Sequence, residues 1–304
     1  MEAGECRRVF SFLFMKTATT IAEQIAQLEQ RGMVITDKAK AEEVLADIGY
    51  YRLGFYWFPF ENKYPNKHNR DHIFSSGTTF EDALSLYYFD HDLRGILTIY
   101  LHRIEIHLRT TLIYIVSNYY KSNPTWFADR RIVAADFLRM LPGLYSDIRK
   151  NDAIKHHHHK YRNDIYAPAW KTLEYMTFGS ILYLIESLKH VDLQQEIALS
   201  MGISNLKVFH SQMQTLRVIR NVCAHGHNLF DLKLAQSIKP GKIKGMEKGQ
   251  RNSLAGGLMV IASILSSISS NRQHEFIDRV NGLLDNANHQ PIGRFISHIT
   301  PLSH

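Results

Sequence analysis

The residues with the clearest capacity for chemistry lie in the segment Gln214-Thr-Leu-Arg-Val-Ile-Arg-Asn-Val-Cys-Ala-His-Gly-His-Asn-Leu-Phe230. An imidazole such as that of His225 can act as general acid or base near neutral pH. Arg220 can direct two guanidinium donors to phosphate oxygens and stabilise the charge that develops on them. Asn221 can hydrogen-bond His225 or a ligand and fix its geometry. Together these groups could move protons and bind a phosphate without a metal or other cofactor.

The same segment is predicted to end a helix over residues 205–224. Its apolar side chains recur at the spacing of a buried face: Leu216, Ile219 and Cys223. A second face carries polar residues four positions apart: Arg217, Asn221 and His225. Gly226 can end the helix directly after His225, where the field of the helix C-terminus favours a protonated imidazole. A capped helix with a solvated polar face remains the alternative, because such short spacings often arise by chance.

Helical periodicity dominates the rest of the chain and predicts an all-α protein without repeats or alternating strands. The helices are expected at residues 19–31, 39–48, 80–120, 126–150, 170–188, 193–199, 205–224, 252–271 and 273–284. The polar stretches 61–79, 151–169 and 231–251 are predicted to be loops. We expect residues 17–304 to form a single domain. We interpret residues 1–16 as an N-terminal extension, with Met15 as an alternative start.

Composition narrows the class of protein. The 36 Lys and Arg residues outnumber the 29 Asp and Glu residues, so a polyanionic partner is plausible. Two cysteines, Cys6 and Cys223, cannot build a disulfide framework or a four-cysteine zinc site, which points to the reducing cytoplasm. The uncharged run 252–271 has the length of a membrane span, but its serines and glycines favour a buried helix. No membrane partner is therefore expected.

Four blocks of sequence resemble known proteins. The arrangement Arg220-Asn-x-x-x-His225 at a helix end resembles the signature of HEPN ribonucleases. The other blocks resemble abortive-infection (Abi) proteins of the AbiD/AbiF type, which act in bacterial defence against phage. These blocks are residues 45–60 (LADIGYYRLGFYWFPF), 86–94 (LYYFDHDLR) with 103–109 (RIEIHLR), and 168–180 (PAWKTLEYMTFGS). Taken in order, the four blocks span roughly residues 19–285.

The resemblance implies a HEPN-like helical bundle with an N-terminal helical extension. It also implies a homodimer in which two copies of the motif helix face each other across one site. Arg220, Asn221 and His225 would be catalytic, and the product would carry a 2′,3′-cyclic phosphate. The alternative is a non-catalytic helical protein that holds a small non-coding RNA. Gly226 stands where the family usually has a second histidine, which His227 could replace, and Asn228-Leu-Phe-Asp231 departs from the family's Arg-Leu-Trp-Asn-like stretch.

Further RNA contacts are expected at Arg217, His227, Arg103, Glu105, Arg109, Arg52, Lys242 and Lys244. For Glu105 and Arg109 the alternative is an i,i+4 ion pair that orders helix packing. The aromatic residues around Arg52 could stack on bases or form core, and the lysines could contact phosphates or simply be solvated. Residues 156–159 are four consecutive histidines, which we interpret as part of a solvated loop rather than as a metal site.

Overall fold

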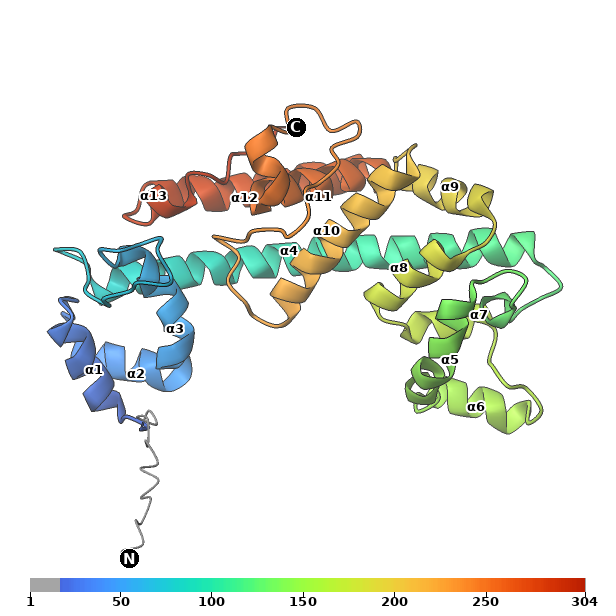
Figure 1. The fold of residues 1–304 in the computed structure, drawn as a ribbon, viewed down its shortest axis with the longest axis horizontal. Helices are drawn as coiled ribbons and strands as arrows, with labels where there is room; N and C mark the ends of the chain where they lie inside the picture. Colours follow the sequence, from blue (N-terminus) through green and yellow to red (C-terminus); the bar gives the residue numbers. More distant parts are fainter. Residues whose placement is uncertain (1–16, 304) are drawn as a thin grey trace, which may run out of the picture. The chain divides into compact units, whose positions relative to one another are not determined.

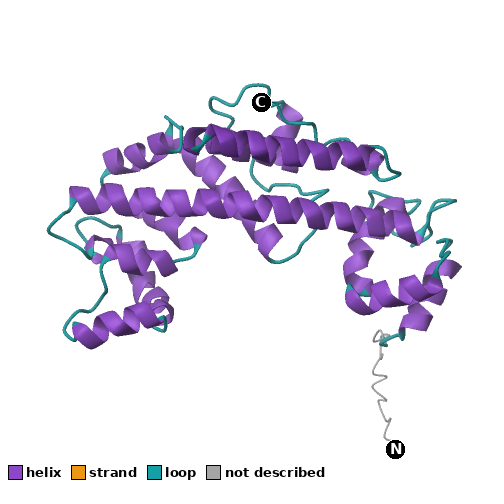
Figure 2. Cartoon of the chain, turned by 180° about the vertical axis from the view of Figure 1, so that it is seen from behind, coloured by secondary structure: helices purple, strands orange, loops and turns teal. Residues whose placement is uncertain are grey.

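An all-α fold is confirmed for residues 17–303, which are the residues that the computed structural model describes. Helices and loops account for this part of the chain, apart from isolated bridge pairs such as Val34 with Thr79 (Figure 2). The expected N-terminal extension 1–16 lies outside the described residues. The chain folds into two compact units, and the boundary between them falls between Tyr87 and Tyr88.

The first unit contains three short helices: α1 (Ile21–Gln30), α2 (Lys38–Asp47) and α3 (Tyr50–Trp57). Asp37 caps α2 as expected, because its carboxylate accepts a hydrogen bond of 2.9 Å from the Lys40 backbone N–H. The 3-10 turn η1 (Phe58–Phe60) follows α3. The aromatic block, residues 45–60, supplies four aromatic core side chains, which are Tyr56, Trp57, Phe58 and Phe60. Core packing is therefore confirmed for most of this block.

The second unit contains the remaining helices, which Figure 1 labels along the chain. They are α4 (Phe80–Tyr119) from Tyr88 onward, α5 (Ala135–Ile148), α6 (Asp152–Lys160), α7 (Ala169–Thr172), α8 (Phe178–Ser187), α9 (Val191–Ser200), α10 (Leu206–Ala224), α11 (Leu254–Ile268), α12 (Ser270–Asn288) and α13 (Gly293–Ile296). The 3-10 turns are η2 (Trp126–Ala128), η3 (Leu173–Tyr175) and η4 (Lys248–Asn252).

The uncharged run forms α11, which packs against α10, α12 and η4. Ten of the fifteen residues of α11 are buried, so its apolar surface serves as protein core. Among the described residues, no helix combines the length and apolarity that crossing a membrane requires. The buried-helix interpretation of this run is confirmed.

Two predicted element boundaries are wrong. Residues 152–160 form α6 instead of part of a loop, because Ile154 and His157, three positions apart, are both buried. The last turn of α6 carries histidines and Lys160, which suit a helix C-terminus. The helix predicted over 170–188 is interrupted where Met176 adopts extended backbone, and Thr177 caps α8 by accepting from the Ser180 N–H.

Candidate functional site

The C-terminal end of α10 has the geometry of a Schellman cap. His225 is the C-cap residue, and Gly226 adopts a positive φ of 65°. The Gly226 N–H bonds the Cys223 carbonyl at 3.2 Å, and the His227 N–H bonds the Val222 carbonyl at 3.0 Å. A left-handed residue strongly favours glycine, so a histidine at position 226 would strain this turn. That His227 takes the place of the family's second histidine stays a prediction.

The turn brings the two histidines together. The ring centroids of His225 and His227 lie 6.0 Å apart, with an interplanar angle of 35°. Both residues are exposed. Two imidazoles at this separation could serve as the base and the acid of one proton-transfer reaction.

Arg220 lies about one helical turn before His225 on α10, and two neighbouring side chains contact its guanidinium. Its Nη1 lies 3.4 Å from the Asn221 Oδ1, and its Nε lies 3.6 Å from Oε2 of Glu105 on α4. The side chain of Glu105 is 9% exposed and that of Arg220 is 40% exposed. The guanidinium therefore has a buried carboxylate on one side and solvent on the other.

Glu105 also forms the ion pair expected with Arg109, at 2.8 Å, so this ion-pair interpretation is confirmed. Arg109 in turn donates to the backbone carbonyl of Met176 at 3.0 Å. Both members of the pair are buried, and solvent reaches this charged network at Arg220 and at Glu174, whose Oε2 lies 3.9 Å from Nη1 of Arg109. The network fixes Glu105, and through it the position of Arg220.

A second buried carboxylate anchors the chain that follows the Schellman cap. Asp90 is fully buried, and its oxygens accept hydrogen bonds from the backbone N–H groups of Leu229 and Phe230 at 2.7 to 2.9 Å. Arg94 donates to Asp90 at 2.6 Å and to the carbonyl of His227 at 3.2 Å. Asp90 and Arg94 thereby clamp the segment that carries His227.

The sequence analysis missed this clamp. The i,i+4 spacing of Asp90 and Arg94 within an apolar helix stripe is a signal of a buried ion pair. Their partners lie more than 130 positions along the chain, so no local pattern could identify them.

A protein-family model described as Abi-like protein matches residues 43–231 of this sequence. The chain belongs to the Abi-like protein family. Membership suggests a role in abortive-infection defence. The matched region contains both the segment around Arg220 and the α4 residues that support it. No curated protein and no solved structure matches the sequence.

The other residues predicted to contact RNA lie in several places on this Abi-like protein. Arg217 and Arg103 are exposed on α10 and α4. Lys242 and Lys244 are exposed in the loop before η4, where they line a hollow of about 390 Å³. Arg52 is exposed on α3 in the first unit. RNA contact by these residues stays a prediction.

The four consecutive histidines do not face solvent together. His157 is 3% exposed, and its Nε2 lies 3.0 Å from the Asp164 carboxylate. His158 Nε2 lies 2.8 Å from the Tyr145 hydroxyl, which accepts a hydrogen bond from the Ala167 N–H. Within residues 17–303, no group of three or more His, Cys, Asp or Glu residues is arranged to hold a metal ion.

Cys223 lies between Arg220 and His225 in the sequence, but its thiol is not a candidate nucleophile. It is partly buried. Burial raises the pKa of its thiol to about 12, against a partly opposing effect of the Arg94 guanidinium. The thiol therefore stays protonated and chemically inert near neutral pH.

Proposed function

We propose that this Abi-like protein is a metal-independent endoribonuclease of the HEPN type that acts in bacterial abortive infection. One observation carries the proposal: His225 and His227 are exposed side by side, one turn after a partly exposed Arg220 that a buried carboxylate holds. Acid–base groups next to a phosphate-binding guanidinium are what transesterification of RNA needs. We place this activity in the cytoplasm, as the cysteine content suggests.

The reaction would run on the RNA's own 2′-hydroxyl. One imidazole removes the proton of the 2′-OH, and the resulting oxygen attacks the adjacent phosphorus. The second imidazole gives a proton to the departing 5′-oxygen. The products are a 2′,3′-cyclic phosphate and a free 5′-hydroxyl. Arg220 would stabilise the charge on the non-bridging phosphate oxygens, while Asn221 holds Arg220 or the RNA in position.

A homodimer fits this chemistry, because a second copy of α10 would add its own arginine and imidazoles to a shared site. Glu105 has a positioning role in this scheme. Its carboxylate lies on the buried side of Arg220 and would leave the opposite side of the guanidinium free for phosphate. The predicted contacts at Arg103, Arg217 and the lysines of the loop before η4 would follow the RNA backbone.

The test is cleavage of end-labelled RNA in excess EDTA, followed by analysis of the termini. We expect cyclic-phosphate ends with the wild-type protein. His225→Ala and Arg220→Ala should each lower the cleavage rate by at least 100-fold, because positioned acid–base groups contribute about 10² to 10⁴. His159→Ala, at an exposed histidine of α6, is the matched control and should cleave normally. Undiminished cleavage by folded His225→Ala protein would refute the assignment.

The alternative is a helical protein that holds a small non-coding RNA without cutting it. The departures from the family pattern at Gly226 and at residues 228–231 favour this alternative. Binding that weakens steeply with salt, with no cyclic-phosphate product at any protein concentration, would support it over the enzyme.

A further inference from the structure

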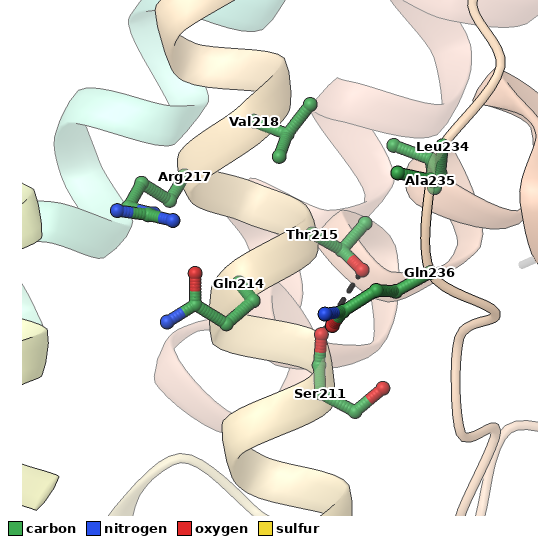
Figure 3. Close-up of a pocket in the computed structure, with 8 residues that line it drawn as sticks. All are labelled: Ser211, Gln214, Thr215, Arg217, Val218, Leu234, Ala235 and Gln236. Atoms are coloured by element: carbon green, nitrogen blue, oxygen red, sulfur yellow. Dashed lines mark hydrogen bonds between the residues drawn. The ribbon is translucent and has the colours of Figure 1, made fainter.

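A hollow of about 450 Å³ lies beside α10, upstream of the proposed catalytic residues (Figure 3). Helix α10 supplies one wall, with Gln214, Arg217 and Val218. The chain that returns past the helix supplies the other, with Leu234, Ala235 and Gln236. The volume is within the range of small-ligand sites.

The hollow is aligned with the proposed catalytic end of α10. Gln214, Val218, Asn221 and His225 follow one another along α10 at intervals of four, three and four residues. Residues three or four apart share one helix face, so the hollow and His225 lie along a common line. At 1.5 Å per residue, Val218 and His225 are about 10 Å apart along the axis. A bound strand following this face would pass both.

The outer wall is fixed in place by hydrogen bonds to the protein. The Lys239 N–H bonds the Ser211 hydroxyl at 3.0 Å, and Gln212 donates to the Lys239 and Pro240 carbonyls. The Leu234 N–H bonds the Asn252 carbonyl at 2.8 Å. Gly241 then turns with a φ of 59°, and a Cβ there would come within 2.7 Å of Val208. The hollow is thus preformed by a tethered segment.

We propose that this hollow is a nucleobase subsite, which receives one unpaired base of the bound RNA at a fixed position relative to the cut. The proposal rests on the ribonuclease function proposed above. Val218, Leu234 and Ala235 offer apolar contact to the ring. The amide of Gln236 offers a donor and an acceptor, which can read the edge of a base. The Gln214 amide points to the other side of α10, where its Nε2 lies 3.5 Å from Oε1 of Glu186. Arg217 is exposed at the rim, where it can pair with the neighbouring phosphate.

The experiment uses the full chain and a pool of single-stranded RNA with randomised sequence, whose cut sites are read by sequencing. Ala235→Trp fills the hollow from an exposed position, and Gln236→Ala removes one amide. Ser237→Trp, an exposed neighbour outside the hollow, is the matched control. We expect the wild type and the control to share a base preference at one fixed position, and both pocket variants to lose it.

A binding measurement supplies the second readout. In a His225→Ala background, the affinity for a labelled oligonucleotide of the preferred sequence should fall about tenfold with Ala235→Trp or Gln236→Ala, and should not change with Ser237→Trp. Millimolar free mononucleotide should compete weakly, because most contacts belong to the strand. If mononucleotide alone displaces the strand completely, the hollow is a free-nucleotide site and the proposal is overturned.

The two proposals fail in different ways. RNA cleavage with a base preference that Ala235→Trp leaves unchanged would overturn the subsite alone. A wild-type protein that neither cuts nor binds RNA would overturn the ribonuclease proposal and the subsite with it.

Discussion

Two histidine-rich segments of this protein look alike in sequence and differ in structure. The first is the run of four histidines on α6, and the second is the pair formed by His225 and His227 at the end of α10. On α6, His157 is buried against Asp164 and His158 bonds Tyr145, so these imidazoles help to hold the helix. At α10 both imidazoles are exposed.

The buried residues that contact each segment explain this difference in exposure. The end of α10 rests on two buried carboxylates of α4, Asp90 and Glu105, whose hydrogen bonds and ion pairs fix the turn and Arg220. The α6 histidines themselves provide the buried contacts. The two segments thus differ in exposure and in support, and the number of consecutive histidines predicts neither.

The largest expected effect is on the support of α10. Asp90→Ala should lower the free energy of unfolding by about 3 to 5 kcal/mol, because it leaves the Arg94 charge buried without its carboxylate and two backbone N–H groups without their acceptor. Chemical denaturation measures this. Asp92→Ala, at an exposed position on the same helix, should stay within about 0.5 kcal/mol of wild type. Equal stability of the two variants would show that the clamp contributes nothing.

The next largest effect comes from comparing an alanine substitution in each histidine segment. His157→Ala should cost about 1 to 3 kcal/mol of stability, because it removes a buried ring and its bond to Asp164, but should leave RNA cleavage unchanged. His225→Ala should do the reverse. Thermal unfolding and the cleavage assay on both variants provide the measurement. Loss of cleavage in a fully folded His157→Ala protein would place α6 in the active site and break the comparison.

The end of α10 could largely be predicted from the sequence, because its determinants are local. The apolar spacing of Leu216 and Ile219 and the glycine at 226 define the helix and its Schellman cap within a dozen residues. The role of the α6 histidines was mispredicted, because polar composition suggested a loop. Their partners Asp164 and Tyr145 lie outside α6, seven and thirteen positions away, so the polar composition of the helix gives no sign that His157 and His158 take part in packing.

The same reason limits the prediction of the site. Arg220, Asn221 and His225 form a recognisable local spacing, but Asp90 acts on a segment far away in the sequence. The ion pair of Glu105 and Arg109 could be predicted from its i,i+4 spacing, whereas the contact from Glu105 to Arg220 depends on how α4 and α10 pack. Long-range polar contacts of this kind have no periodic signature.

A smaller effect should appear in the response to acid. Burial lowers the pKa of His158 below its ordinary value of 6.5, so the unfolded chain binds this proton more readily than the folded protein. Stability from this group is therefore present above pH 6.5 and is lost as the pH falls below it. His158→Phe should reduce the fall in Tm between pH 7 and 5.5, whereas His159→Phe, at an exposed neighbour, should keep the wild-type slope. Identical slopes in both variants would contradict the lowered pKa of the partly buried His158.

The prediction with the least effect on the stability of the fold concerns the Cys223 thiol, and it tests how firmly the end of α10 is held. With a thiol pKa of about 12, only about one Cys223 in ten thousand is ionised at pH 8. In a Cys6→Ser background, a thiol reagent should therefore modify the folded protein more than a thousandfold slower than the protein in denaturant, where an ordinary pKa near 8.5 returns. With a chromogenic thiol reagent, the rise in absorbance over time measures the rate of Cys223 modification. Fast modification under native conditions would mean that the last turn of α10 opens readily. The carboxylates of α4 would then be a weaker support for His225 than the contrast with α6 requires.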